Sequence, residues 1–181
     1  RTVASLAAVA GDIAQVESVV RDLLEVARPD AVRRAPGDLN ALVTRCLEQV
    51  APRLAYRNIR CEVALDPAVP LMPLDAGRLQ QAVLNVINNA SDAMTAGGCL
   101  TVRTVVGPGA VTIAVADDGP GVPEEVLAHV FDPFFTTKPD GVGLGLMNAR
   151  SVVEQHGGRI VLEPGTPLGT RVTMTVPLAS G

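Results

Sequence analysis

The sequence is poor in aromatic residues: among 181 residues it has no Trp, one Tyr and three Phe. Because 48% of the residues are nonetheless hydrophobic, the core must be built from aliphatic side chains. The three Phe all lie between positions 131 and 135, so most of the large aromatic surface belongs to one short segment. That concentration indicates a hinge or lid that packs against another part of the molecule.

Charge clusters and cysteine motifs are also missing. The formal net charge is −4 without a block of like charge, which argues against a nucleic-acid-binding surface. Cys46, Cys61 and Cys99 are odd in number and lack metal-ligand spacing. We interpret them as unpaired thiols in a reducing cytoplasm.

Long apolar runs are absent as well. No run approaches the roughly 20 apolar residues that a membrane-spanning helix needs, and no signal peptide is visible. The chain begins at Arg1 rather than Met, so we expect it to be a fragment of a longer protein. We expect this portion to be cytoplasmic. The longer protein is expected to be cytoplasmic or in the inner membrane, with any membrane attachment made through segments absent here.

The hydrophobic pattern divides the chain into three parts. Residues 1–28 carry apolar residues at three- and four-residue spacing, which predicts a long helix that packs on a partner. An ordinary amphipathic helix packed on its own domain would show the same pattern. Residues 29–37 contain two prolines and two arginines and are interpreted as a linker. Residues 38–181 form the main domain.

The main domain is predicted to be an α+β sandwich. Helices are expected from Asp38 to about Leu54, from Asp75 to Met94, over 123–130, and from about Gly143 to Gln155. Strands are expected at 59–65, 100–106, 110–116, 159–163 and 170–176. The last four strands form two hairpins. A mostly antiparallel sheet with helices on one face is the architecture that this order favours.

Two asparagines on the second of these helices are candidate metal ligands. Asn85 and Asn89 are four residues apart, so their side chains point the same way. A neutral amide oxygen can bind Mg²⁺, which prefers oxygen ligands and keeps several waters. Asp92 lies on the same helix, either close to this site or as a solvated residue. Capping or solvent-facing asparagines would give the same pattern.

Asp117 ends an apolar strand and is followed by Gly119 and Gly121. A carboxylate at this position can accept a hydrogen bond from the amino group of adenine, whereas the carbonyl oxygen of guanine would be repelled. The two glycines permit close backbone approach and positive φ. Taken alone, the sequence Asp-Gly-Pro-Gly is also simply a good turn.

The Phe cluster leads through Lys138 into a glycine-rich loop that opens a helix. Lys138 is placed to meet phosphate oxygens as a point charge. Glycine amides and a helix N-terminus together make an anion site. The loop is not a P-loop, because no Gly-Lys-Ser/Thr follows, and not a Rossmann fingerprint, because no strand precedes it. Its residues are Gly141, Gly143, Leu144, Gly145 and Leu146.

In this order and spacing, the four motifs resemble the nucleotide-binding domain of bacterial sensor histidine kinases of two-component systems. Those motifs begin at Asn85, Asp117, Phe131 and Gly141, and the resemblance covers roughly residues 38–178. The wider superfamily includes gyrase, MutL and the ninety-kilodalton heat-shock chaperones. The short lid is similar to that of the nitrogen-regulatory branch. The resemblance implies the Bergerat ATP-binding fold, with ATP and Mg²⁺ as ligands.

The resemblance also assigns roles to individual residues. It implies that Asn89 ligates the metal with Asn85 beside it, and that Asp117 contacts adenine with support from Thr170. The segment with Phe134 and Lys138 begins the flexible lid over ATP.

The histidine that receives the phosphate is not expected in this chain. Its two histidines, His129 and His156, lie outside residues 1–28 and are interpreted as structural. Residues 1–28 resemble the second helix of a dimerisation hairpin, whose first helix would lie upstream. The resemblance therefore implies a homodimer in the longer protein and a response-regulator receiver domain as partner. We expect this chain to bind ATP without phosphorylating itself.

Two alternatives belong to other classes. An ATP hydrolase of the gyrase or MutL kind would carry a general-base Glu where this chain has Asn85, and an amide cannot take a proton from water at neutral pH. A non-catalytic regulatory module would use the fold for binding alone. The presence of Asn89, Asp117 and all the glycines argues against such decay.

Overall fold

The computed structural model describes residues 32–138, 141–165 and 168–178. The helix expected over 1–28 and the first residues of the linker lie outside the described residues. The described elements, in chain order, are β1 (Ala35–Gly37), α2 (Leu39–Tyr56), β2 (Ile59–Leu65), β3 (Met72–Leu74), α3 (Ala76–Ala93), β4 (Gly98–Gly107), β5 (Ala110–Asp117), α4 (Glu124–Leu127), α5 (Gly145–Gln155), β6 (Arg159–Pro164) and β7 (Thr170–Pro177).

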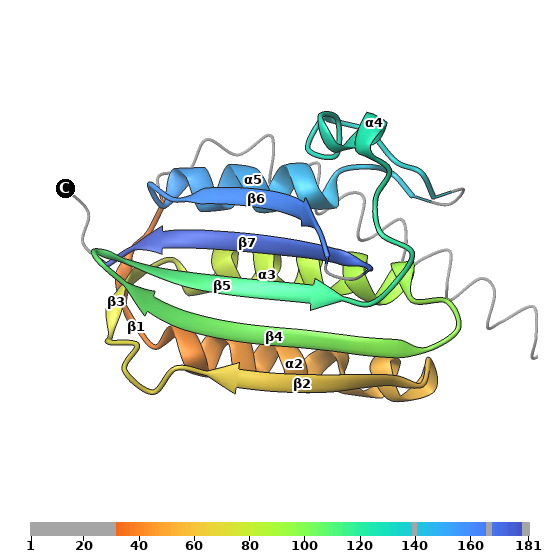
Figure 1. The fold of residues 1–181 in the computed structure, drawn as a ribbon. Helices are drawn as coiled ribbons and strands as arrows, with labels where there is room; N and C mark the ends of the chain where they lie inside the picture. The colour runs from red at the N-terminus through yellow and green to blue at the C-terminus, as the bar shows by residue number, and fades with distance from the viewer. Residues whose placement is uncertain (1–31, 139–140, 166–167, 179–181) are drawn as a thin grey trace, which may run out of the picture.

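The central sheet has five strands in the order β2-β4-β5-β7-β6 (Figure 1). The β4–β5, β5–β7 and β6–β7 pairs are antiparallel, as the predicted hairpins require. The β2–β4 pair is parallel, because the chain crosses through α3 before it returns to the sheet. The predicted α+β sandwich with a mostly antiparallel sheet is therefore confirmed.

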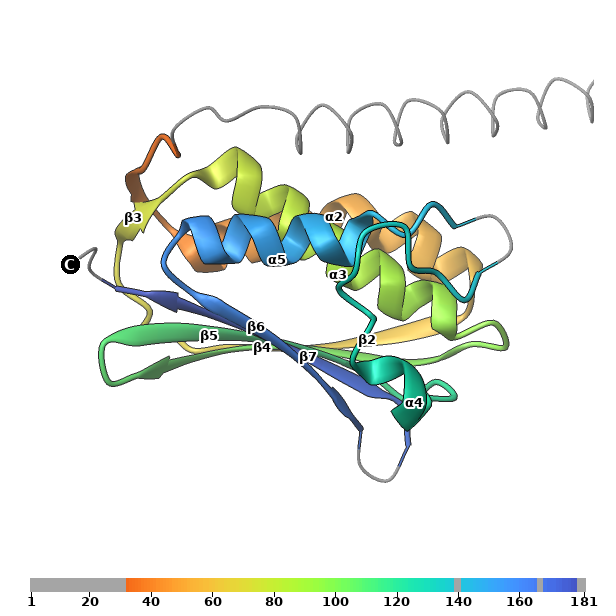
Figure 2. The ribbon, with the colours of Figure 1, turned by 90° about the horizontal axis from the view of Figure 1, so that it is seen from above.

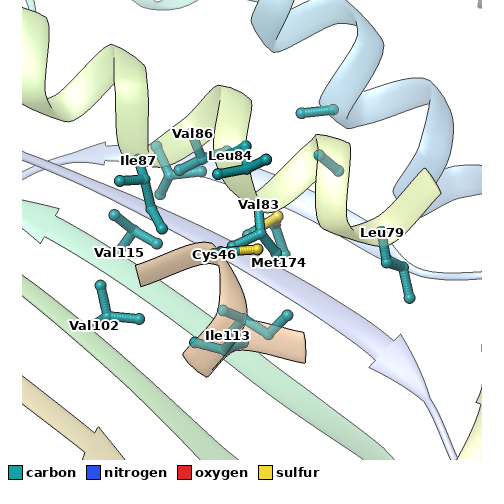
Figure 3. Close-up of a cluster of buried hydrophobic side chains, with 14 of the residues drawn as sticks. Cys46, Leu79, Val83, Leu84, Val86, Ile87, Val102, Ile113, Val115 and Met174 are labelled. Carbon is teal, nitrogen blue, oxygen red and sulfur yellow. The ribbon is translucent and has the colours of Figure 1, made fainter. Parts of the chain in front are cut away.

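Helices α2, α3 and α5 cover one face of this sheet (Figure 2). Asp38 begins α2 by accepting a hydrogen bond from the Ala41 N–H at 2.9 Å, and Asp75 begins α3 through the Arg78 N–H at 3.2 Å. The core between helices and sheet is aliphatic, as the composition predicts. Figure 3 shows α3 side chains such as Val83 and Ile87 against Ile113 and Val115 of the sheet.

A small second sheet adds two strands that the sequence analysis does not predict. β1 pairs antiparallel with β3, with Pro36 opposite Pro73. β1 lies at the end of the segment interpreted as a linker, and β3 directly precedes the Asp75 cap of α3. A proline in each strand removes a backbone donor, so both segments look like loops in the sequence. Two helices are also shorter than expected: α4 has four residues, and α5 begins at Gly145 rather than Gly143.

His156 links the ends of two helices beneath this small sheet. Its Nε2 accepts a hydrogen bond from the Asp75 N–H at 3.0 Å, and its Nδ1 donates to the Val152 carbonyl at 2.7 Å. Burial lowers the pKa of the His156 imidazole, so the neutral tautomer with a proton on Nδ1 fits these contacts. His156 therefore has a structural position. His129 lies exposed in the segment before the Phe cluster, with its Nδ1 2.8 Å from an Asp132 carboxylate oxygen.

Candidate functional site

A cavity of about 500 Å³ lies where α3, the start of α5 and the loop after β5 meet. The C-terminal end of β5, the N-terminal end of α5 and α4 lie at the same end of the molecule (Figures 1 and 2). The volume falls in the range typical of small-molecule sites. Predicted site residues that line the cavity are Asn85, Asn89, Asp92, Gly121, Lys138, Gly141, Gly143, Leu144, Gly145 and Leu146.

Asn89 and Lys138 contact each other across the cavity. The Lys138 ammonium donates to the Asn89 Oδ1 at 2.8 Å and to the Asp92 carboxylate at 3.1 Å. The amide oxygen predicted to bind a metal thus already has a cation beside it. This contact joins the lid to α3, and it places a positive charge at this end of the cavity.

Asn85 makes contacts that differ from those of Asn89. Its Oδ1 accepts a hydrogen bond from the Gln81 side chain at 3.1 Å, and its Nδ2 donates to the Gly145 carbonyl at 3.1 Å. The side chain therefore fastens α3 to the first residue of α5. Of the two asparagines, Asn89 is the better candidate for a metal ligand.

Asp117 is buried, with 8% of its surface exposed, and does not itself line the cavity. Its Oδ1 accepts a hydrogen bond from the Gly119 N–H at 3.0 Å, which closes the turn that leads to Gly121. Burial raises the pKa of the Asp117 carboxyl, and the backbone hydrogen bonds from Gly119 and Thr170 oppose this rise. Thr170 lies directly opposite Asp117 in the β5–β7 pair. Asp117 and its predicted support Thr170 are thus neighbours in the sheet, and Gly119 adds a further contact to the carboxylate.

The glycine-rich loop forms the entrance to α5. Gly143 has φ of +75°, and Leu144 at the N-cap makes no side-chain capping hydrogen bond. The first N–H groups of an α-helix have no partner within the helix. The start of α5 faces the cavity and has no capping side chain. Its free N–H groups can therefore bind an anion.

Phe134 is a predicted site residue that lies outside the cavity lining in this structure. Its side chain is 65% exposed and does not line the cavity, whereas Phe135 does. The backbone of Phe134 has φ of +62°, a left-handed conformation that a non-glycine residue seldom adopts. Phe135 also lies near His129, with 5.9 Å between ring centroids. The aromatic contact expected from the Phe cluster is therefore made by Phe135.

Several lining residues were not predicted. Asn88 follows Asn85 by three residues, so helical periodicity, the signal that was overlooked, also puts it on the cavity side of α3. Arg53 comes from α2, far from every motif in the sequence, and only the packing of α2 on α3 brings it here. The apolar lining outside the motifs comes from Val122, Pro123, Val126, Val130 and Leu162.

Comparisons with known proteins agree with this geometry. Residues 74–180 match the family described as histidine kinase-, DNA gyrase B-, and HSP90-like ATPases. The sensor histidine kinase ZraS of Klebsiella oxytoca is 38% identical over 165 residues, covering 91% of this chain and 36% of that protein. Full-length ShkA in complex with AMPPNP matches with a TM-score of 0.82 at 29% identity, over 95% of this chain and 37% of that chain. ThkA, in complex with the response regulator protein TrrA, shares the fold, with a TM-score of 0.80 at 24% identity over 94% of this chain and 49% of that chain.

The chain therefore belongs to the family of histidine kinase-, DNA gyrase B-, and HSP90-like ATPases. Within that family, its main domain is an ATP-binding catalytic domain of the sensor histidine kinase type. The chain spans 36% of the length of ZraS, so it corresponds to a part of such a kinase. In the residues that the structure describes, no helix is both long and apolar enough to cross a membrane.

The donor set of the cavity fits Mg²⁺ rather than a transition metal. The described residues contain no group of three or more His, Cys, Asp or Glu that could hold an ion. Instead the cavity offers the Asn89 amide oxygen, which already accepts from the Lys138 ammonium. Mg²⁺ is commonly held by one or two protein oxygens together with substrate phosphates and waters. Asn89 suits that kind of site.

Proposed function

We propose that this chain binds Mg²⁺-ATP and supplies the γ-phosphate that a sensor histidine kinase transfers to a histidine outside this segment. The observation that carries the proposal is the meeting of Asn89, Lys138 and the uncapped start of α5 around one cavity. Asp117 lies outside the cavity lining but accepts a hydrogen bond in the turn that leads to Gly121, which does line it. A nucleotide laid across this space has its phosphates near positive charge and its base near a carboxylate.

Each residue has a defined task in this proposal. Asp117 accepts a hydrogen bond from the adenine amino group, and Gly119 and Thr170 hold its carboxylate. Lys138 and the backbone from Gly141 to Leu146 hold phosphate oxygens. Asn89 would hold Mg²⁺, which when bound neutralises phosphate charge. Phosphoryl transfer in general depends mostly on such positioning and charge neutralisation.

The proposal also covers the other segments of this chain and the longer kinase to which it would belong. Residues 1–28 would be the second helix of a dimerisation hairpin, residues 29–37 the linker, and residues 38–181 the catalytic domain. The longer protein would form a homodimer through the hairpin and pass its phosphate to the receiver domain of a response regulator. ThkA, which shares the fold, forms a complex with a response regulator.

The contacts of Asn85 disfavour ATP hydrolysis as the main activity. A hydrolase needs a general base beside the attacking water. The side chain at this position is an amide, and it is already hydrogen-bonded to Gln81 and to the Gly145 carbonyl. Water in the cavity therefore meets no base at this position.

Incubation with ATP labelled in the γ-phosphate tests the proposal. We expect no phosphohistidine on this chain alone, because His156 is buried with both ring nitrogens hydrogen-bonded and His129 stands outside the cavity lining. A longer chain that extends upstream through the hairpin should become labelled on a histidine in that extension. Phosphohistidine on the short chain, or an unlabelled longer chain that binds ATP, would contradict the proposal.

A further inference from the structure

Arg53 occupies a place in the cavity that none of the sequence motifs assigns. It lies in the last turn of α2, and its side chain is 40% exposed. One guanidinium nitrogen donates to the Asn88 Oδ1 at 3.0 Å, and the other pairs with the Asp92 carboxylate. Both partners are on α3 and both line the cavity, beside Asn89. The guanidinium is therefore held at the same end as the metal-ligand candidate.

Asp92 is shared by three cations. Besides Arg53, it pairs with Arg57 at 3.2 Å and with Lys138 at 3.1 Å. One carboxylate cannot neutralise three positive charges, so the cluster of Asp92 with these three cations keeps a net positive charge. Arg53 and Lys138 line the cavity, whereas Arg57 does not and donates instead to the Ser91 carbonyl at 2.9 Å. The excess charge that reaches the cavity thus comes from Arg53 and Lys138.

We propose that Arg53 is a second phosphate-binding cation, which acts together with Lys138 on the β- and γ-phosphates of the nucleotide. This inference rests on the proposed function. A guanidinium has five N–H donors in a planar fork that matches phosphate oxygens, and its two contacts here use two of them. The pair with Asp92 is partly exposed, and such pairs contribute little stability, so phosphate can compete for the guanidinium.

Asp92 then has a task that the sequence alone does not assign. A carboxylate next to phosphates would repel them, but its three ion pairs offset that charge. Asp92 is a positioning residue, which keeps Arg53 and Lys138 on the two sides of the phosphate position. Its effect on the nucleotide passes through these cations.

Arg53→Gln and Arg57→Gln form a matched pair for the test. Each removes one ion pair with Asp92 from the same end of α2, but only the first removes a charge that lines the cavity. Dissociation constants for adenosine, ADP and ATP should be measured with each protein, in Mg²⁺ and in EDTA. Thermal unfolding without ligand shows whether the two variants are equally folded.

Arg53→Gln should weaken ATP binding by about tenfold or more, because a charged hydrogen-bond pair is lost, and leave adenosine binding unchanged. Arg57→Gln should bind all three like the wild type, and Arg53→Lys should recover part of the loss. The inference would be overturned if Arg53→Gln lost no affinity for ATP, or if it lost as much affinity for adenosine as for ATP. It would also be overturned if Arg57→Gln lost as much ATP affinity as Arg53→Gln. Wild-type protein that binds none of the three would contradict the proposed function itself.

Discussion

Asp117→Asn should abolish measurable ATP binding under conditions in which the wild type saturates. The asparagine oxygen would keep the hydrogen bond from the Gly119 N–H, because that contact closes the turn. The amide NH₂ would then take the place of the second carboxylate oxygen, where it faces the adenine amino group, another donor. Two unsatisfied donors in a buried contact cost enough to weaken binding about a hundredfold or more. Calorimetric titration of both proteins with ATP measures the difference.

The same substitution should leave the fold at least as stable at pH 7. Burial raises the pKa of Asp117 in the folded state above its ordinary value of 3.8. A raised pKa means that the folded state favours the protonated carboxyl. The protonated Asp117 carboxyl therefore contributes stability to the fold. This contribution is fully present below the pKa that the carboxyl has in the unfolded state, and it is lost as pH rises through its pKa in the folded state. At pH 7 the wild type therefore buries an unfavourable charge that asparagine lacks.

Thermal unfolding at several pH values checks this sign. The Tm of Asp117→Asn should equal or exceed that of the wild type at pH 7, and this advantage should shrink as pH falls toward the ordinary carboxyl pKa. A variant that loses ATP binding while remaining folded separates recognition from stability. A variant that is markedly less stable at pH 7 would show that the carboxylate holds the turn, and its binding loss would then not report on adenine.

Gly143→Ala is expected to weaken ATP binding about tenfold or more. We expect this loss to come from displacement of the lid and not from a change in the hydrophobic core. A Cβ at Gly143 would lie 2.5 Å from the Phe134 carbonyl carbon and 2.6 Å from the Phe135 oxygen, and both are backbone atoms. A surface segment relieves such a clash by moving. The movement displaces the segment that carries Lys138 and Phe135, both of which line the cavity.

Gly109→Ala is the matched control for this substitution. Gly109 has φ of +74°, almost the same as the +75° of Gly143, but a Cβ there would meet nothing within 4 Å. Both variants bear the left-handed backbone cost of roughly 1–2 kcal/mol. Isothermal titration and thermal unfolding should show similar losses of Tm but a loss of ATP affinity in Gly143→Ala alone. Wild-type affinity in Gly143→Ala would contradict the assigned role of the loop.

Features that depend on residues close together in the sequence could be predicted from the sequence. Asp38 and Asp75 cap helices where expected, and the strands of both hairpins follow from alternation and turn glycines. The spacing of Asn85 and Asn89 put both on the cavity side of α3 because helical periodicity is regular. The glycine-rich loop was found from its composition together with its place after Asp117 and behind the Phe cluster.

Other features depend on contacts between segments that are far apart in the sequence, which a local sequence pattern does not predict. β1 and β3 each contain a proline, and only their pairing with each other makes them strands. Phe134 and Phe135 are adjacent and equally apolar, yet only Phe135 lines the cavity, and Phe134 has a left-handed backbone. Arg53 reaches the site only because α2 packs on α3, which brings together residues of distant sequence position.

Calorimetric titration of this chain with ATP and GTP, each with and without Mg²⁺, tests the central claim most directly. The account predicts saturable binding of ATP that Mg²⁺ strengthens, and GTP binding weaker by about a hundredfold or more, because the Asp117 carboxylate would face a carbonyl oxygen. A folded sample that binds neither nucleotide, or binds GTP as tightly as ATP, would contradict it.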